Sequence, residues 1–157
     1  MDQILLNCLG LVCRRYKKYN NTIFGLVGAA IVTKEYDPVY ETAMQTMSQK
    51  WKHAEHCVIE KFHRLHGELP KDAILVTTLS PCFNDMGDRD GESCSDIITK
   101  YGIKIVYSGI EDTTQLSHDE DHYNKVPFDL IITKNSDIKD LCSLLLNKIS
   151  KINYLYF

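Results

Sequence analysis

Apolar side chains recur every three or four residues in several stretches of the chain, and this spacing predicts amphipathic helices. Four stretches follow the pattern, covering residues 2–18, 53–66, 94–101 and 137–152. Gly67 and Gly102 come directly after the second and third stretches, where glycine commonly ends a helix. Ser136 or Asp137 can cap the last helix with its side-chain oxygen.

Short runs of apolar and β-branched residues lie between these stretches and predict strands. The runs cover residues 24–32, 39–44, 74–79, 103–107 and 130–133. Residues 34–38 predict a hairpin turn between the first two strands. A short helix over residues 120–125 would allow the last two strands to run parallel, because a parallel pair needs a long crossover. The alternation of strands and helices predicts a layered α/β domain in which helices cover a sheet.

Composition narrows the class of protein. The chain has 157 residues, 44% of them hydrophobic and 25% charged, which predicts one soluble domain over residues 1–157. A net charge of -3 argues against a domain that binds nucleic acid through overall positive charge. The N-terminus has no secretory signal pattern, and no apolar stretch is long enough to cross a bilayer. We therefore expect a cytoplasmic protein whose six cysteines are reduced thiols.

Side chains that bind zinc occur in one particular order along the chain. His53 begins a His-Ala-Glu triplet that ends at Glu55, Cys82 follows a proline, and Cys94 comes later. A catalytic zinc site uses three protein ligands and leaves the fourth position to water, whereas a structural site uses four ligands. Zinc can lower the pKa of water from about 15.7 to about 7 and so supply a nucleophile at neutral pH. We therefore predict zinc ligands at His53, Cys82 and Cys94, with Glu55 as the group that moves protons.

These residues resemble the motifs of the cytidine deaminase superfamily. The matching runs are His53-Ala54-Glu55, Leu79-Ser80-Pro81-Cys82, and residues 93–98 and 102–109. The resemblance covers residues 24–109 best and implies a three-layer α/β/α cytidine-deaminase-like fold, with a mixed five-stranded sheet and helices on both faces. It also implies that the backbone N–H of Ala54 and the carbonyl of Ser80 contact the substrate ring.

Two departures from the superfamily pattern leave the substrate open. Eleven residues, 83–93, separate the two cysteines, where the superfamily commonly has two. Arg89 in this insert is a candidate substrate-binding residue because a guanidinium suits phosphate, and the alternative is a surface loop that pairs Arg89 with its acidic neighbours. Superfamily members often carry a ribose-binding Asn about ten residues before the His, and Gln45 is the nearest substitute here.

Several other residues have both a structural and a functional interpretation. His118 and His122 stand four residues apart and could bind a second metal on a helix, although a solvated acidic loop is favoured. Cys57 lies four residues after His53 and could approach the zinc, but a buried packing cysteine is the commoner role. Trp51 could stack on a base or anchor the core.

The sequence thus predicts a zinc-dependent hydrolytic deaminase of nucleotide metabolism that acts on a C–N bond of a cyclic amidine. We expect a small-molecule substrate, namely an aminated cytosine-like ring in a nucleoside, nucleotide or aminopyrimidine, and the superfamily resemblance is compatible with a homo-oligomer.

Two alternatives remain. The first is a deaminase that acts on a base within DNA or RNA, as a toxin or effector would. It would be favoured by a cationic stripe built from Arg14, Arg15, Lys17, Lys18 and Lys52. The second is a catalytically inactive binding module that zinc stabilises, which the presence of Glu55 argues against because a structural site has no use for that carboxylate.

Overall fold

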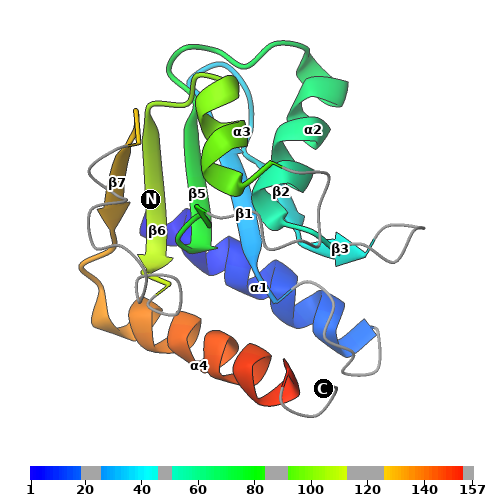
Figure 1. Cartoon of the computed structure of the whole chain (residues 1–157), viewed down its shortest axis with the longest axis vertical. Coiled ribbons are helices and arrows are strands. Elements are labelled where there is room, and N and C mark those ends of the chain that lie inside the picture. The colour runs from blue at the N-terminus through cyan, green and yellow to red at the C-terminus, as the bar shows by residue number, and fades with distance from the viewer. Residues whose placement is uncertain (19–25, 46–50, 84–91, 113–125, 154–157) are drawn as a thin grey trace.

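A mixed five-stranded sheet forms the centre of the molecule (Figure 1). The computed structural model describes residues 1–18, 26–45, 51–83, 92–112 and 126–153. In spatial order the strands are β2 (Val39–Thr42), β1 (Gly28–Val32), β5 (Ile74–Leu79), β6 (Ile105–Ile110) and β7 (Asp129–Ile132). Strand β1 is antiparallel to β2 and β5, whereas β5, β6 and β7 are parallel. The predicted mixed sheet and its parallel last pair are confirmed.

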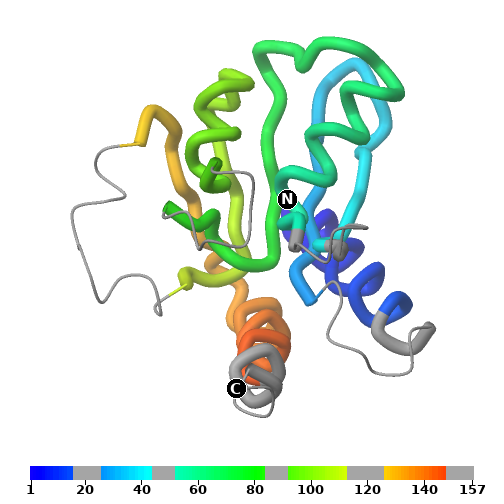
Figure 2. The backbone as a smooth tube through the Cα atoms, turned by 45° about the vertical axis from the view of Figure 1, so that its right-hand side comes forward, coloured from blue at the N-terminus to red at the C-terminus, as the bar shows by residue number. Residues whose placement is uncertain are grey.

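Helices cover both faces of this sheet. The two faces carry α1 (Asp2–Lys18) with α4 (Ser136–Asn153) on one side, and α2 (Ala54–His66) with α3 (Cys94–Lys100) on the other (Figures 1 and 2). Neighbouring residues of β5 divide between two buried clusters, because side chains alternate across a strand. Leu75 packs in the cluster of α2 and α3, and Val76 packs in the cluster of α1 and α4. The predicted three-layer α/β/α fold is therefore confirmed.

The two predicted glycine caps are present. Gly67 has a φ of 85° and donates its N–H to the carbonyl of His63, which ends α2. Gly102 has a φ of 69° just after α3. Both angles lie in the region that favours glycine, since a Cβ is strained there. No helix in the described ranges is long and apolar enough to cross a membrane.

Several predicted boundaries are displaced. The helix predicted over residues 53–66 begins at Ala54, because His53 has the extended conformation of an N-cap, with φ -67° and ψ 157°. The strand predicted over residues 103–107 is β6 (Ile105–Ile110), since the N–H of Ile103 closes the end of the preceding helix by bonding to the Ile98 carbonyl at 3.1 Å. Tertiary hydrogen bonds of this kind are invisible to a hydrophobic pattern.

Two strand predictions are also altered. The first predicted strand, residues 24–32, is β1 from Gly28 onward, and residues 24 and 25 lie outside the described part of the chain. The strand predicted over 39–44 stops at Thr42, after which β3 (Met44–Gln45) pairs with β4 (Trp51–Lys52) in a separate small sheet. Two-residue strands are too short to show alternation, so this sheet was not predicted. The helix expected over 120–125 lies outside the described residues.

Candidate zinc site

The three predicted zinc ligands come from three different elements that meet at one end of the sheet. His53 is the N-cap of α2, Cys82 lies three residues beyond the end of β5, and Cys94 is the first residue of α3. The N-terminal ends of α2 and α3 and the carboxyl end of β5 lie on the same side of the sheet's strand direction, at the carboxyl end of β5 (Figure 1). The ligand atoms of these three residues lie within 4.8 Å of one another.

The spacing of these atoms fits a tetrahedral zinc ion. The Nδ1 atom of His53 lies 3.7 Å from the Sγ of Cys82 and 3.4 Å from the Sγ of Cys94. Ordinary Zn–S and Zn–N bonds at a tetrahedral angle put imidazole nitrogen and thiolate sulfur about 3.6 Å apart. Among the described residues, this is the group of His, Cys, Asp and Glu side chains that could hold a metal ion. The donor set and its dimensions therefore fit zinc.

The start of α3 fixes the position of both cysteines. The backbone N–H of Cys94 points to the Sγ of Cys82 at 3.3 Å, and the N–H of Ser95 bonds to the Cys82 carbonyl at 3.0 Å. Ser93 and Asp96 form a reciprocal capping box that begins the helix. An N–H donor at a helix N-terminus stabilises thiolate. Sequence reasoning missed the capping box, although Ser93 followed three residues later by Asp96 fits the pattern of a Ser or Thr three residues before an acidic residue.

Glu55 lies in the first turn of α2 and is almost fully buried. Its Oε2 atom is 3.5 Å from the Sγ of Cys94, and its Oε1 atom is 3.3 Å from the Oγ1 of Thr77. Burial raises the pKa of the Glu55 carboxyl above its ordinary value, and the nearby charge of His53 opposes that rise. The sequence prediction did not include Thr77, since no local pattern links it to a residue 22 positions earlier.

Of the four predicted substrate-binding residues, the structure describes three. Ala54 is buried at the first position of α2, where a backbone N–H has no partner within the helix. Ser80 is buried, its N–H bonds to the Ile110 carbonyl, and its Oγ accepts the N–H of Asp112 at 2.8 Å. The backbone of Gln45 pairs with Trp51 between β3 and β4. Arg89 lies outside the described residues.

Cys57, another residue that the sequence singles out, does not join the cluster of candidate ligands. The Sγ of Cys57 is buried and points to the carbonyl of Lys52 at 3.6 Å, in keeping with a packing role. His118 and His122 lie outside the described part of the chain. None of the six cysteines, all within the described ranges, forms a disulfide.

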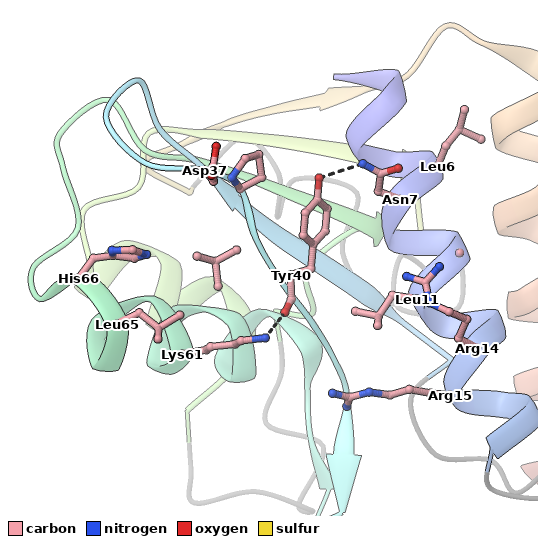
Figure 3. A pocket seen from close by; sticks show the side chains of 13 residues that line it. Leu6, Asn7, Leu11, Arg14, Arg15, Asp37, Tyr40, Lys61, Leu65 and His66 are labelled. Atoms are coloured by element: carbon pink, nitrogen blue, oxygen red, sulfur yellow. Dashed lines mark hydrogen bonds between the residues drawn. The ribbon is translucent and has the colours of Figure 1, made fainter.

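A separate cavity of about 670 Å³ lies at the β2 edge of the sheet, between α1 and α2 (Figure 3). Its lining includes Arg14, Arg15 and Lys61, and none of the predicted zinc ligands. Arg15 forms an ion pair with the buried Glu41, Lys61 lies 3.5 Å from the same carboxylate, and Lys61 also donates to the Tyr40 carbonyl.

These ion pairs bear on the predicted cationic stripe. Arg15 is paired with Glu41, and Lys52 is paired with Glu60. A paired cation offers less charge to a phosphate backbone than a solvated one. Two of the five residues of the stripe therefore contribute less to nucleic-acid binding than the sequence alone suggests.

The comparison with known families agrees with this geometry. Residues 3–110 match the family described as "Cytidine and deoxycytidylate deaminase zinc-binding region". The match spans more than half of the chain, and the chain belongs to this family of zinc-binding deaminases. No curated protein matches the chain at a significant level.

Solved structures show the same fold. One is the diaminohydroxyphosphoribosylaminopyrimidine deaminase/5-amino-6-(5-phosphoribosylamino)uracil reductase of Thermotoga maritima, with a TM-score of 0.58, 24% identity and 80% coverage of this chain. This chain spans about a third, 34%, of that bifunctional protein. The dCMP deaminase of cyanophage S-TIM5 has a TM-score of 0.54 and 16% identity, covering 85% of this chain and 99% of its own. The guanine deaminase of Bacillus subtilis has a TM-score of 0.53 and 22% identity, covering 93% of each chain.

Proposed function

We propose that this protein hydrolytically deaminates a small molecule with an aminated cytosine-like ring, in the form of a nucleoside, nucleotide or aminopyrimidine. The observation that carries the proposal is a buried carboxyl group, Glu55, beside a cluster of one imidazole and two thiols. The cluster has a zinc-binding donor set, and the carboxyl group is not part of it. A purely structural zinc site has no need of such a group.

Each residue has a role in this reaction. His53, Cys82 and Cys94 would hold the metal, and zinc, when bound, is a Lewis acid that makes water a stronger nucleophile at neutral pH. Glu55 accepts a proton from the attacking water and passes it to a ring nitrogen. Glu55 then takes the second proton of that water from the hydroxyl now bound to the ring carbon and delivers it to the amine; the C–N bond breaks as the C=O bond forms, and the amine leaves as ammonia. Burial of Glu55 suits proton transfer, because it raises the pKa of the carboxyl group toward neutral pH, where the group can both accept and release a proton.

The substrate-binding residues form a second part of the proposal. The Ala54 N–H and the Ser80 carbonyl would hold the polar edge of the ring at the start of α2 and just beyond β5. Gln45 would contact the sugar, and Arg89 would contact a phosphate. Gln45 is compatible with this role because β3, on which it lies, pairs with β4, which runs directly into His53.

Three observations favour a small molecule over a base within nucleic acid. The net charge is -3, and Arg15 and Lys52 are held in ion pairs. The structurally similar dCMP and guanine deaminases are named for small nucleotide and nucleobase substrates. A strand of nucleic acid would instead need a positively charged or aromatic groove to track its backbone.

The test is ammonia release by purified protein of measured zinc content. Cytosine, adenine, guanine and aminopyrimidine compounds are assayed as bases, nucleosides, nucleotides and single-stranded oligonucleotides. Glu55→Gln should retain zinc and lose activity by roughly 10²- to 10⁴-fold, the usual contribution of a general acid–base group. Glu60→Gln is the matched control, because Glu60 lies on the same helix but is exposed.

The outcome of this assay distinguishes three functions. Release from a free pyrimidine derivative that requires Glu55 would support the proposal. Release from oligonucleotides alone would replace it with a nucleic-acid deaminase. Full zinc occupancy with no release from any compound would instead favour a binding module.

A further inference from the structure

Thr77 makes a contact that the deaminase motif does not account for. It lies on β5 with its side chain on the α2 face of the sheet, and it is fully buried. Its Oγ1 atom is 3.3 Å from Oε1 of Glu55 and 2.9 Å from the carbonyl of Leu79. We propose that Thr77 is the positioning residue for Glu55, holding Oε1 so that Oε2 faces the metal ligands. This inference rests on the proposed function.

The two oxygens of the Glu55 carboxyl group have different surroundings. Oε1 contacts the hydroxyl of Thr77, and Oε2 lies 3.5 Å from the Sγ of Cys94, on the side of the metal cluster. A glutamate side chain has three rotatable bonds, so burial alone does not select one orientation of its carboxyl plane. A hydrogen bond to one of the two oxygens does select one orientation of the plane. Thr77 therefore fixes the orientation in which the Glu55 carboxyl plane faces the reacting atoms.

A hydroxyl group is well suited to this contact. It carries one hydrogen and two acceptor lone pairs. When the hydrogen points to Oε1, Thr77 donates to an ionised carboxylate and, once Oε2 carries the proton, to the carbonyl oxygen that remains. The Leu79 carbonyl, 2.9 Å from Oγ1, offers the same hydrogen a second acceptor. The contact thus persists while Glu55 gains and loses a proton, and water has little access to replace it because Thr77 and Glu55 are 0% and 3% exposed.

The next residue provides an internal comparison. Thr78 is also buried, with 3% exposure, but its hydroxyl accepts the backbone N–H of Gly28 at 3.1 Å. The Thr78 hydroxyl thus contributes to the sheet, and among the described residues no hydrogen bond joins it to the carboxyl group of Glu55. Replacing either threonine by valine removes one hydroxyl from the same strand. The two variants therefore separate a role in positioning Glu55 from a role in stability.

The experiment compares zinc-loaded Thr77→Val, Thr77→Ser and Thr78→Val with the unmodified protein. Thr77→Val should lower kcat by roughly 10- to 100-fold with KM within about twofold, because misplacement of a proton-transfer group acts on the chemical step. Thr77→Ser, which keeps the hydroxyl, should recover most of kcat. Thr78→Val should lower the melting temperature and leave kcat unchanged, since it leaves an N–H without its acceptor.

A crystal structure of zinc-loaded Thr77→Val provides a readout that does not depend on turnover. The expected result is a Glu55 carboxyl group that is rotated or present in two conformers, with zinc content unchanged. An unmoved Glu55, or an equal loss of kcat in the valine and serine variants, would overturn the inference. If the unmodified protein releases no ammonia from any compound, the proposed function fails, and the position of Glu55 in the two structures still decides whether Thr77 holds it.

Discussion

Gly109→Ala should destabilise the protein by forcing apart two packed layers. Gly109 lies on β6, between the neighbouring strand β5 and helix α4. A Cβ at this position would lie 2.4 Å from the Sγ of Cys142 and 2.9 Å from the carbonyl oxygen of Thr78. Real Cβ atoms essentially never approach so closely, so the Cys142 side chain, the helix or the strand must move.

The size of the effect follows from the two close contacts. Adding a methyl group to a tightly packed interior commonly costs about 1–3 kcal/mol. The Thr78 carbonyl is backbone in the middle layer and cannot move as a flexible side chain would, which favours the upper part of this range. For a domain of this length, each kcal/mol lowers the melting temperature by about 2–4 °C. We therefore expect the melting temperature to fall by roughly 2–12 °C.

A double-mutant cycle measures how much of this cost comes from Cys142. Cys142→Ala alone removes the sulfur that lies closest to the new methyl group, at a cost on the order of 1 kcal/mol. The double variant Gly109→Ala/Cys142→Ala should be more stable than the sum of the two costs predicts, by about 0.5 kcal/mol or more. Free energies of unfolding come from urea titration of the zinc-loaded protein. A Gly109→Ala variant as stable as the unmodified protein, or strictly additive costs, would refute the reasoning.

Three further predictions concern the metal site and the thiols. Cys94→Ser should lower the bound zinc, measured by atomic absorption, and should lower the melting temperature, because metal binding to the folded state adds to stability; full zinc retention would argue against this ligand. Ser93→Ala removes the capping box of α3 and should cost about 1 kcal/mol in urea titration, with an unchanged midpoint as the contrary result. In the zinc-loaded native protein, a thiol reagent at pH 8 should modify only the exposed Cys13 quickly. Burial raises the pKa of the other three thiols that do not bind zinc, to about 12 for Cys8 and Cys57 and about 11 for Cys142. These three should react only on unfolding or at much higher pH, and rapid modification of more than one thiol would contradict the burial.

The candidate metal ligands could be named from the sequence because the prediction depended on residue identity and order. His, Cys and Glu side chains of the required types stand at positions 53, 55, 82 and 94, each next to the end of a predicted element. In an α/β sheet the carboxyl ends of strands and the starts of the following helices lie at one edge, which brings these side chains together. The ligand atoms do lie within 4.8 Å of one another.

The small sheet of β3 and β4 could not be predicted in the same way. Each strand has two residues, and their pairing joins Met44 to Lys52 and Gln45 to Trp51. So short a pairing shows no periodicity, and the chain between the strands lies outside the described residues. Strand β4 comes directly before His53, and its pairing with β3 therefore helps to fix the direction in which the chain enters α2.

Local chemistry by itself determined the class of this protein. Three patterns carried this information: the order of ligand residues, the hydrophobic periodicity and the glycine caps. Each can be recognised within short stretches of the sequence, because each depends on residues that are near one another along the chain. The tertiary structure alone decided which distant groups touch. Thr77 meets Glu55, and Gly109 meets Cys142, only because the order and register of the strands bring them together. These contacts depend on how whole layers pack, and no local pattern of side chains encodes that packing.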